Sequence, residues 1–247
     1  VAQSLGHCRE LYERLGVNLS ADDVRGESFY NPMLPGVVEA LGQVGLLTES
    51  EGAQCVFLNP FKGKEAQPLP LIVRKSDGGF LYATTDLAAL RFRVGELAAD
   101  RLIYVTDARQ AQHFAYFFAV AREAGFVPDH VELTHVAFGT IQGPDGKPMK
   151  TREGDLIPLA DVLDEAERRA ADIVAQKNPG LSEDARRQVA RMVGVGAIKY
   201  FDLSNNRLSD YRFDWDKMLA LTGNTAPYLQ YACVRIRSIY RKGGLSA

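Results

Sequence analysis

The middle of the chain most constrains the fold, because its pattern alternates between helix and strand. A helix is predicted near residues 85–97, a strand at 101–106, a helix near 109–124 and a strand within 131–138. Strand, helix and strand joined by short connections indicate a right-handed βαβ unit in a parallel sheet. Ligands of such sheets bind beyond the carboxyl ends of the strands.

The segment before this alternation contains both helices and strands. Residues 1–15 are predicted to be helical up to Gly16, and Asn31-Pro32 is a plausible entry to a helix through Leu41. Strands are predicted at residues 55–58, 71–73 and 80–83, with a hairpin turn at Asp77-Gly78-Gly79. Thr84-Thr85-Asp86 reads as the next helix start, with a hydroxyl cap and an acid in the first turn.

After residue 157 the chain is predicted to be wholly helical. The apolar residues that follow keep helical spacing until Asn178-Pro179-Gly180 ends the first helix. Ser182 is a candidate cap for the next helix, and Thr225-Ala226-Pro227 opens the last one.

Composition indicates a soluble globular protein and gives no sign of a metal or disulfide framework. The chain has 46% hydrophobic and 24% charged residues, and no apolar run is long enough to cross a bilayer. The cysteines lie far apart and the histidines form no ligand pair, which argues against a zinc site and for a reducing compartment. These residues are Cys8, Cys55, Cys233, His7, His113, His130 and His135. We expect a cytoplasmic protein without a signal peptide.

Charge is distributed unevenly along the chain. The net charge is −2, yet five basic and no acidic residues occur from Lys217 to the end. Such a region can meet phosphate groups, although a solvated helix face is the simpler explanation.

A loop rich in glycine and cations, Gly143-Pro-Asp-Gly-Lys-Pro-Met-Lys-Thr-Arg-Glu-Gly154, follows the last predicted strand. Lys147, Lys150 and Arg152 could stabilise phosphate charge that develops during a reaction. An ordinary surface turn is the alternative, because Asp145-Gly146 is a strong turn dipeptide.

Four polar side chains near the strand ends are candidate ligand-binding groups. Asp86 could bind a guanidinium through paired hydrogen bonds, with Tyr82 beside it, or it could only cap a helix. Gln110 could supply a neutral amide, and His113 could donate to a phosphate or ribose oxygen; both could equally be surface residues of a helix. The chain contains neither a P-loop nor a G-x-G-x-x-G turn after a strand, so any nucleotide must be held another way.

Several long motifs in one order resemble those of bacterial arginyl-tRNA synthetase, a class I aminoacyl-tRNA synthetase, across nearly the whole chain. They are Gly26-Glu-Ser-Phe-Tyr-Asn-Pro-Met-Leu-Pro-Gly36, Asp77-Gly-Gly-Phe-Leu-Tyr-Ala-Thr-Thr-Asp86, Asp107-Ala-Arg-Gln110, Asp145-Gly-Lys-Pro-Met-Lys-Thr-Arg152, Asp214-Trp-Asp216 and Gly223-Asn-Thr-Ala-Pro-Tyr-Leu-Gln-Tyr231. The resemblance implies an α/β fold: the second half of a Rossmann-type parallel-sheet catalytic domain, followed by an all-α helical region.

The resemblance also implies a role for each candidate residue. Tyr82, Asp86 and Gln110 match positions that recognise arginine. ATP-binding roles fall to His113, Phe138, Gly139 and Met149. Lys150, Arg152 and, more weakly, Lys147 match the class I Lys-Met-Ser-Lys-Ser element, which stabilises the pyrophosphate side of the reaction.

Two departures from the family pattern concern the ATP site. Pro148-Met-Lys-Thr-Arg152 replaces both signature lysines of the loop, and the chain contains no His-x-Gly-His segment. We therefore expect a fragment that is inactive alone. Its predicted divisions are a partial catalytic domain at 1–157, a helical stem-contact region at 158–223 and the start of an anticodon-binding domain at 224–247.

The activity implied is ATP-dependent formation of arginyl-adenylate and transfer of arginine to tRNA(Arg). Magnesium is expected to accompany ATP, with no metal ligands from the protein and no membrane partner, and the full-length protein is expected to be a monomer. The alternative is a non-catalytic module, derived from a synthetase, that binds a nucleotide, RNA or another partner.

Overall fold

The chain divides into two compact units, each with its own apolar core. The computed structural model describes residues 2–143, 145–147 and 157–244. One unit is Asp23–Phe138, and the other joins Val1–Asp22 to Gly139–Ala247. The boundaries predicted at residues 157/158 and 223/224 concern functional domains and stay predictions.

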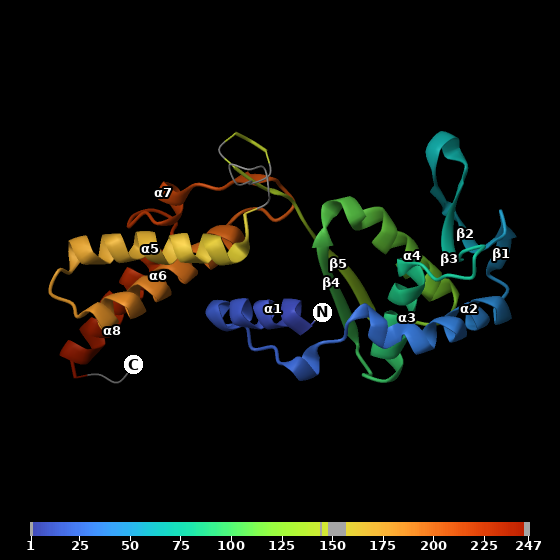
Figure 1. Cartoon of the computed structure of the whole chain (residues 1–247), viewed down its shortest axis with the longest axis horizontal. Coiled ribbons are helices and arrows are strands. Elements are labelled where there is room, and N and C mark those ends of the chain that lie inside the picture. Colours follow the sequence, from blue (N-terminus) through green and yellow to red (C-terminus); the bar gives the residue numbers. More distant parts are fainter. Residues whose placement is uncertain (1, 144, 148–156, 245–247) are drawn as a thin grey trace. The chain divides into compact units, whose positions relative to one another are not determined.

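The Asp23–Phe138 unit is mixed α/β (Figure 1). Its main elements are α2 (Leu34–Gln43), β1 (Leu47–Ser50), β2 (Ala53–Lys62), β3 (Pro68–Arg74), α3 (Tyr82–Gly95), β4 (Arg101–Asp107), α4 (Ala111–Glu123) and β5 (Glu132–Phe138). A 3₁₀ helix, Glu27–Met33, precedes α2 and contains Asn31 and Pro32, so the predicted helix entry lies in 3₁₀ rather than α geometry.

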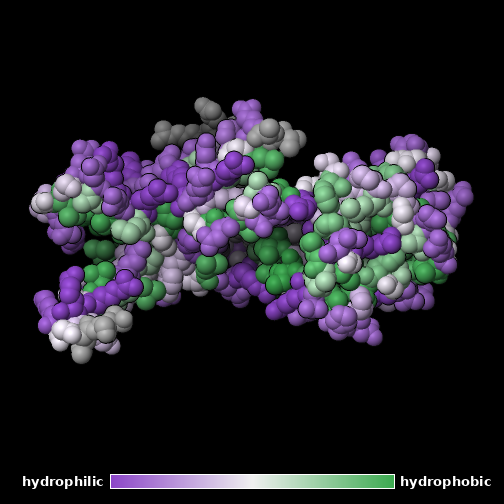
Figure 2. All heavy atoms as spheres, turned by 90° about the horizontal axis from the view of Figure 1, so that it is seen from below, coloured by the Kyte–Doolittle hydropathy of each residue, from purple (hydrophilic) through white to green (hydrophobic). Residues whose placement is uncertain are grey.

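Strands β4 and β5 form the predicted parallel pair, with α4 between them in the chain. Their register runs from Arg101 opposite Glu132 to Asp107 opposite Phe138. Alternate residues of β4 differ in burial, as a strand requires: Leu102 is 4% exposed, whereas Ile103 and Val105 are 53% and 62% exposed. Ile103 and Val105 therefore form part of an exposed apolar face of β4, and apolar patches interrupt the hydrophilic surface of this unit in Figure 2.

Strands β1, β2 and β3 form a separate antiparallel sheet. The turn predicted at Asp77-Gly78-Gly79 is confirmed, because Lys75 N donates to Gly79 O at 2.8 Å and Phe80 bridges Arg74. The strand predicted at 80–83 is wrong beyond that bridge, since α3 already begins at Tyr82. Propensity favoured a strand there, but packing against β3 and α2 supports a helix.

The second unit is mainly helical. Its elements are α1 (Ala2–Leu15), β6 (Ile141–Gln142), α5 (Leu159–Lys177), α6 (Glu183–Ser204), β7 (Tyr211–Arg212), α7 (Trp215–Met218) and α8 (Ala226–Lys242). The predicted caps are confirmed: Ser182 Oγ accepts from Ala185 N and Thr225 Oγ1 accepts from Tyr228 N, both at 3.3 Å. Helices α5 and α6 pack closely at Gly194, where a Cβ would lie 2.8 Å from the backbone of Ala166.

The region predicted to be wholly helical also contains a short strand. Strand β7 pairs in parallel with β6, joining residues about 70 positions apart. Two-residue strands have no periodicity, so the sequence pattern could not indicate this pairing.

Helix α8 presents many apolar side chains to solvent. Tyr231, Val234 and Ile239 are 57%, 63% and 68% exposed. No helix within the described part of the chain is both long and apolar enough to span a bilayer.

Candidate functional site

Tyr82 and Asp86 lie one turn apart on α3, and the helix start differs from the prediction. Leu81 is the N-cap, so Asp86 lies in the second turn. The hydroxyl of Thr84 does not cap the helix: it is fully buried and donates to Val73 O of β3 at 2.5 Å. Asp86 is therefore free of a capping role, which removes the structural alternative considered for its carboxylate.

Asp86 on α3 meets His113 on α4. The Nε2 atom of His113 lies 2.7 Å from Oδ2 of Asp86, and the two side chains are 18% and 32% exposed, respectively. The ring of Tyr82 makes an edge contact with the imidazole at a centroid distance of 4.9 Å, and Tyr82 itself is 65% exposed. Three of the predicted site residues thus form one cluster with an accessible side.

Gln110 is the N-cap of α4, one turn before His113. Its side chain is exposed, and among the described contacts none joins it to Tyr82 or Asp86. Gln110 is therefore close to His113 in the sequence, but no described hydrogen bond links its side chain to Tyr82 or Asp86.

Asp107 shapes the turn between β4 and α4, a role that the sequence motif alone did not assign. Its carboxylate accepts from Arg109 N, Nε and Nη2, each at 2.8 Å. These hydrogen bonds from Arg109 lower the pKa of Asp107 to about 2. The resulting turn determines where the first residues of α4 lie.

Phe138 and Gly139, predicted to contact ATP, lie at the carboxyl end of β5. Phe138 is 42% exposed. A Cβ on Gly139 would lie 2.8 Å from the carbonyl carbon and oxygen of Ser209, so only glycine fits there without a shift. Gly139 N donates to Arg207 O at 2.7 Å.

We call residues 139–142 the loop root and residues 206–213 the strap. Asp210 of the strap accepts from Thr140 N at 2.6 Å and from Gln142 Nε2 at 3.1 Å. The strap is held to α6 in turn, because the Tyr211 hydroxyl donates to Asp202. The sequence pattern did not indicate a role for Asp210, because the two residues that donate hydrogen bonds to it lie 70 and 68 positions away in the chain.

The beginning of the cationic loop forms the turn predicted at Asp145-Gly146. Gly143 N donates to Lys147 O at 2.7 Å, and Gly146 has a φ of 73°. Lys147 N donates to Asp145 Oδ1 at 3.1 Å, and the lysine side chain is exposed. Met149, Lys150 and Arg152 lie outside the described residues, so their predicted roles stay predictions.

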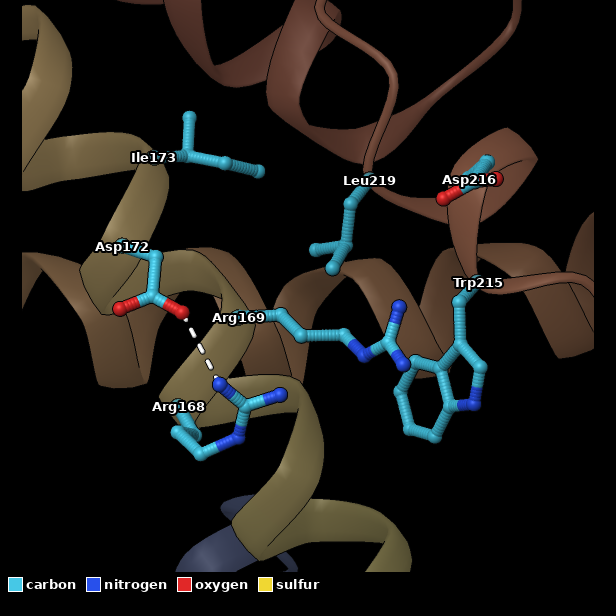
Figure 3. A pocket seen from close by; sticks show the side chains of 7 residues that line it. All are labelled: Arg168, Arg169, Asp172, Ile173, Trp215, Asp216 and Leu219. Carbon is cyan, nitrogen blue, oxygen red and sulfur yellow. Dashed lines mark hydrogen bonds and ion pairs between the residues drawn. The ribbon is translucent and has the colours of Figure 1, made fainter.

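Two adjoining pockets of about 410 and 480 Å³ lie in the helical unit, and none of the predicted site residues lines them. Both include Arg169, Trp215 and Asp216. The Arg169 guanidinium lies over the Trp215 ring, 5.0 Å from its centroid (Figure 3).

The arginines beside these pockets are paired with acids. Arg169 Nε lies 2.6 Å from Glu165, and Arg168 Nη1 lies 3.0 Å from Asp172. Hydrogen bonds from Arg168 and Arg169 lower the pKa of Glu165 to about 2. The pocket wall thus carries an exposed guanidinium group at Arg168 and a half-buried one at Arg169, together with a large aromatic ring.

Metal-binding groups are not assembled in the part of the chain that the structure describes. No cluster of three or more His, Cys, Asp or Glu side chains capable of holding a metal ion occurs there. Magnesium that accompanies ATP is held largely by phosphates and waters, so this finding does not test the magnesium prediction, which stays a prediction.

Known proteins that resemble the chain agree on one family. Residues 3–215 match the family described as tRNA synthetases class I (R), catalytic domain. Proteins named arginine–tRNA ligase from Azotobacter vinelandii and Idiomarina loihiensis are 59% and 57% identical over 98% and 99% of this chain. The chain spans 42% of the length of each.

Solved structures give the same result for the fold. The arginyl-tRNA synthetase of Plasmodium falciparum matches with a TM-score of 0.82 and 34% identity, covering 98% of this chain and 39% of that one. The Thermus thermophilus arginyl-tRNA synthetase matches with a TM-score of 0.73 and 26% identity, covering 87% of this chain and 41% of that one. The predicted Rossmann-type α/β class is confirmed, and the chain belongs to the class I tRNA synthetase (R) catalytic-domain family.

Proposed function

We propose that this chain is part of an arginine–tRNA ligase, which activates L-arginine with ATP as arginyl-adenylate and transfers it to tRNA(Arg). The observation that carries the proposal is the cluster of Tyr82, Asp86 and His113, which presents a carboxylate beside an exposed phenol. The shared motifs and the 59% identity to a protein of that name support the same reaction.

Asp86 supplies the chemistry that recognises arginine. A carboxylate and a guanidinium form two parallel hydrogen bonds, which a lysine ammonium cannot reproduce. Tyr82 adds an apolar ring wall with a polar hydroxyl, and Gln110 provides a neutral amide at the start of α4. Together these groups suit a long, flat cation.

The ATP side of the reaction is proposed to use the backbone at Phe138 and Gly139, with Met149 beside it. Lys147, Lys150 and Arg152 are proposed to stabilise negative charge as pyrophosphate leaves. Magnesium is proposed to arrive with the ATP phosphates as part of the substrate, and no step is assigned to it.

Catalysis of this kind depends on positioning and electrostatics. The arginine carboxylate attacks the α-phosphorus of ATP, and pyrophosphate leaves with its bonding electrons. No covalent bond to the protein is needed, so the protein contributes orientation and charge stabilisation.

The helical region at 158–223 is proposed to contact tRNA, and the segment at 224–247 to begin an anticodon-binding domain. The guanidinium groups of Arg168, which is exposed, and Arg169, which is half-buried, suit RNA phosphates, and the Trp215 ring lies beside them. The exposed apolar side chains of α8 suit packing against further helices.

The whole protein is proposed to be a cytoplasmic monomer, and this chain to be inactive alone. The chain spans 42% of its curated relatives and contains no His-x-Gly-His segment, the other ATP signature implied by the resemblance.

Arginine-dependent ATP–pyrophosphate exchange by the full-length protein, with tRNA present, tests the proposal. Asp86→Ala is expected to abolish exchange, because the guanidinium loses its partner. Asp100→Ala is the matched control, since that side chain is 87% exposed, and it should keep wild-type exchange. ATP–pyrophosphate exchange that does not depend on arginine, or an exchange rate that Asp86→Ala leaves unchanged, would contradict the proposal. Either result would favour a non-catalytic module or a synthetase for another amino acid.

A further inference from the structure

We infer that His113 is a positioning residue for arginine recognition: it holds the carboxylate of Asp86 in the orientation that receives the guanidinium. The inference rests on the proposed function and deepens it, because the sequence had linked His113 to ATP. The observation behind the inference is one short hydrogen bond of 2.7 Å between His113 and Asp86, which joins helices α4 and α3.

The imidazole is itself held in place by aromatic neighbours. Ring centroids of Phe114 and Phe117 lie 5.5 and 5.2 Å from that of His113, and both phenylalanines are buried. The Tyr82 ring lies on α3 at 4.9 Å. Aromatic packing from both helices restricts the orientation of His113, so its Nε2 atom meets Asp86 in a defined geometry.

Helix α4 is anchored one turn beyond His113. The Tyr116 hydroxyl lies 2.9 Å from Val56 O and 2.6 Å from Leu69 O, and accepts from Leu58 N at 3.2 Å. Tyr116 is only 2% exposed. The antiparallel sheet β1–β2–β3 therefore fixes the helix that carries the imidazole.

The hydrogen bond leaves most of the carboxylate available. A carboxylate has two oxygens with about four acceptor positions, and His113 uses one of them on Oδ2. A carboxylate that is already oriented loses less rotational freedom when a guanidinium binds. Asp86, which receives this bond, and Tyr82, which packs on the imidazole, are both among the residues predicted to recognise arginine.

Steady-state exchange kinetics of full-length His113→Ala, His113→Gln and wild type, with tRNA present, test the inference. Loss of a hydrogen bond to a charged group should raise the KM for arginine about ten-fold or more in His113→Ala. The kcat and the KM for ATP should change by less than about two-fold. Glutamine places an amide donor near the position of Nε2, so His113→Gln should recover most of the lost affinity.

Three results would overturn the inference while wild-type exchange remains arginine-dependent. A raised KM for ATP with an unchanged KM for arginine would assign His113 to ATP. Unchanged values of both constants would remove any role, and no recovery in a folded His113→Gln would mean that the aromatic packing alone matters. Thermal unfolding of each variant establishes that it is folded. Wild-type exchange that does not depend on arginine would instead refute the proposed function.

Discussion

The arginine side and the ATP side of the proposed site are supported in different ways. The Tyr82–Asp86–His113 cluster rests on buried groups: Thr84, Tyr116 and Phe117 are each at most 2% exposed. The loop root is held by the exposed strap through Asp210 and backbone hydrogen bonds. Buried contacts resist change, whereas exposed contacts exchange readily with water. The arginine side is therefore expected to be rigid and the ATP side adjustable.

The largest expected effect is loss of the aromatic packing under the arginine side. Phe117→Ala should destabilise the Asp23–Phe138 unit by about 3–5 kcal/mol, because it leaves a cavity beside His113. Thermal unfolding of the full-length protein measures this. Phe29→Ala is the control, since Phe29 is 41% exposed and should cost much less. Equal effects would contradict the distinction between buried and exposed support.

Removal of one buried hydroxyl should have the next largest effect. Tyr116→Phe removes the one O–H donor that lies within reach of two carbonyl groups, together with the acceptor of the Leu58 amide, which costs about 1–3 kcal/mol. The thermal unfolding temperature should fall, and the KM for arginine should rise. Tyr12→Phe, at a 41% exposed site, should change neither. A Tyr116→Phe protein with wild-type stability and KM would break the link between the antiparallel sheet and the site.

Loss of a hydrogen bond from the strap should change the KM for ATP more than it changes the stability of the protein. Asp210→Ala removes the acceptor for Thr140 N and Gln142 Nε2, both exposed, so the stability loss should be at most about 1 kcal/mol. The KM for ATP should nevertheless rise several-fold, because the backbone at Thr140, next to Gly139, loses its hydrogen bond to Asp210. Asp184→Ala, whose side chain is 83% exposed, is the control. A raised KM for arginine instead of ATP would contradict the separation of the two sides.

The smallest effect concerns pH and the turn before α4. The folded-state pKa of Asp107 is lowered to about 2, so its ionised form stabilises the fold above the unfolded pKa of about 4. That contribution should be lost as pH falls from about 4 through 2. Asp107→Asn should flatten the decline of stability in this range, as measured by acid unfolding. An identical decline in both proteins would show that Arg109 does not stabilise the turn through this carboxylate.

The sequence predicted the parts of the fold that have periodicity. The β4–α4–β5 unit, the end of α5 and the beginnings of α6 and α8 agree with their patterns and caps. The pairing of β6 with β7 could not be predicted, since two residues give no period and their partners are distant in the chain.

The sequence named three candidate residues that the structure brings together, but it did not indicate what supports them. Tyr82, Asp86 and His113 were named, but the bond between the last two depends on how α3 and α4 pack. Thr84 was predicted to cap α3 because a hydroxyl near a helix start usually does so, yet burial gave it Val73 O as a partner. Asp210 carried no local signal, because its partners Thr140 and Gln142 lie 70 and 68 positions away in the sequence.

Direct binding of L-arginine to the full-length protein tests the central claim, that Asp86 recognises the guanidinium. Titration calorimetry of wild type and Asp86→Asn compares a carboxylate with a neutral group of the same shape. Loss of the charge-assisted pair should weaken binding about ten-fold or more. Equal affinity of the two proteins for arginine would contradict the account.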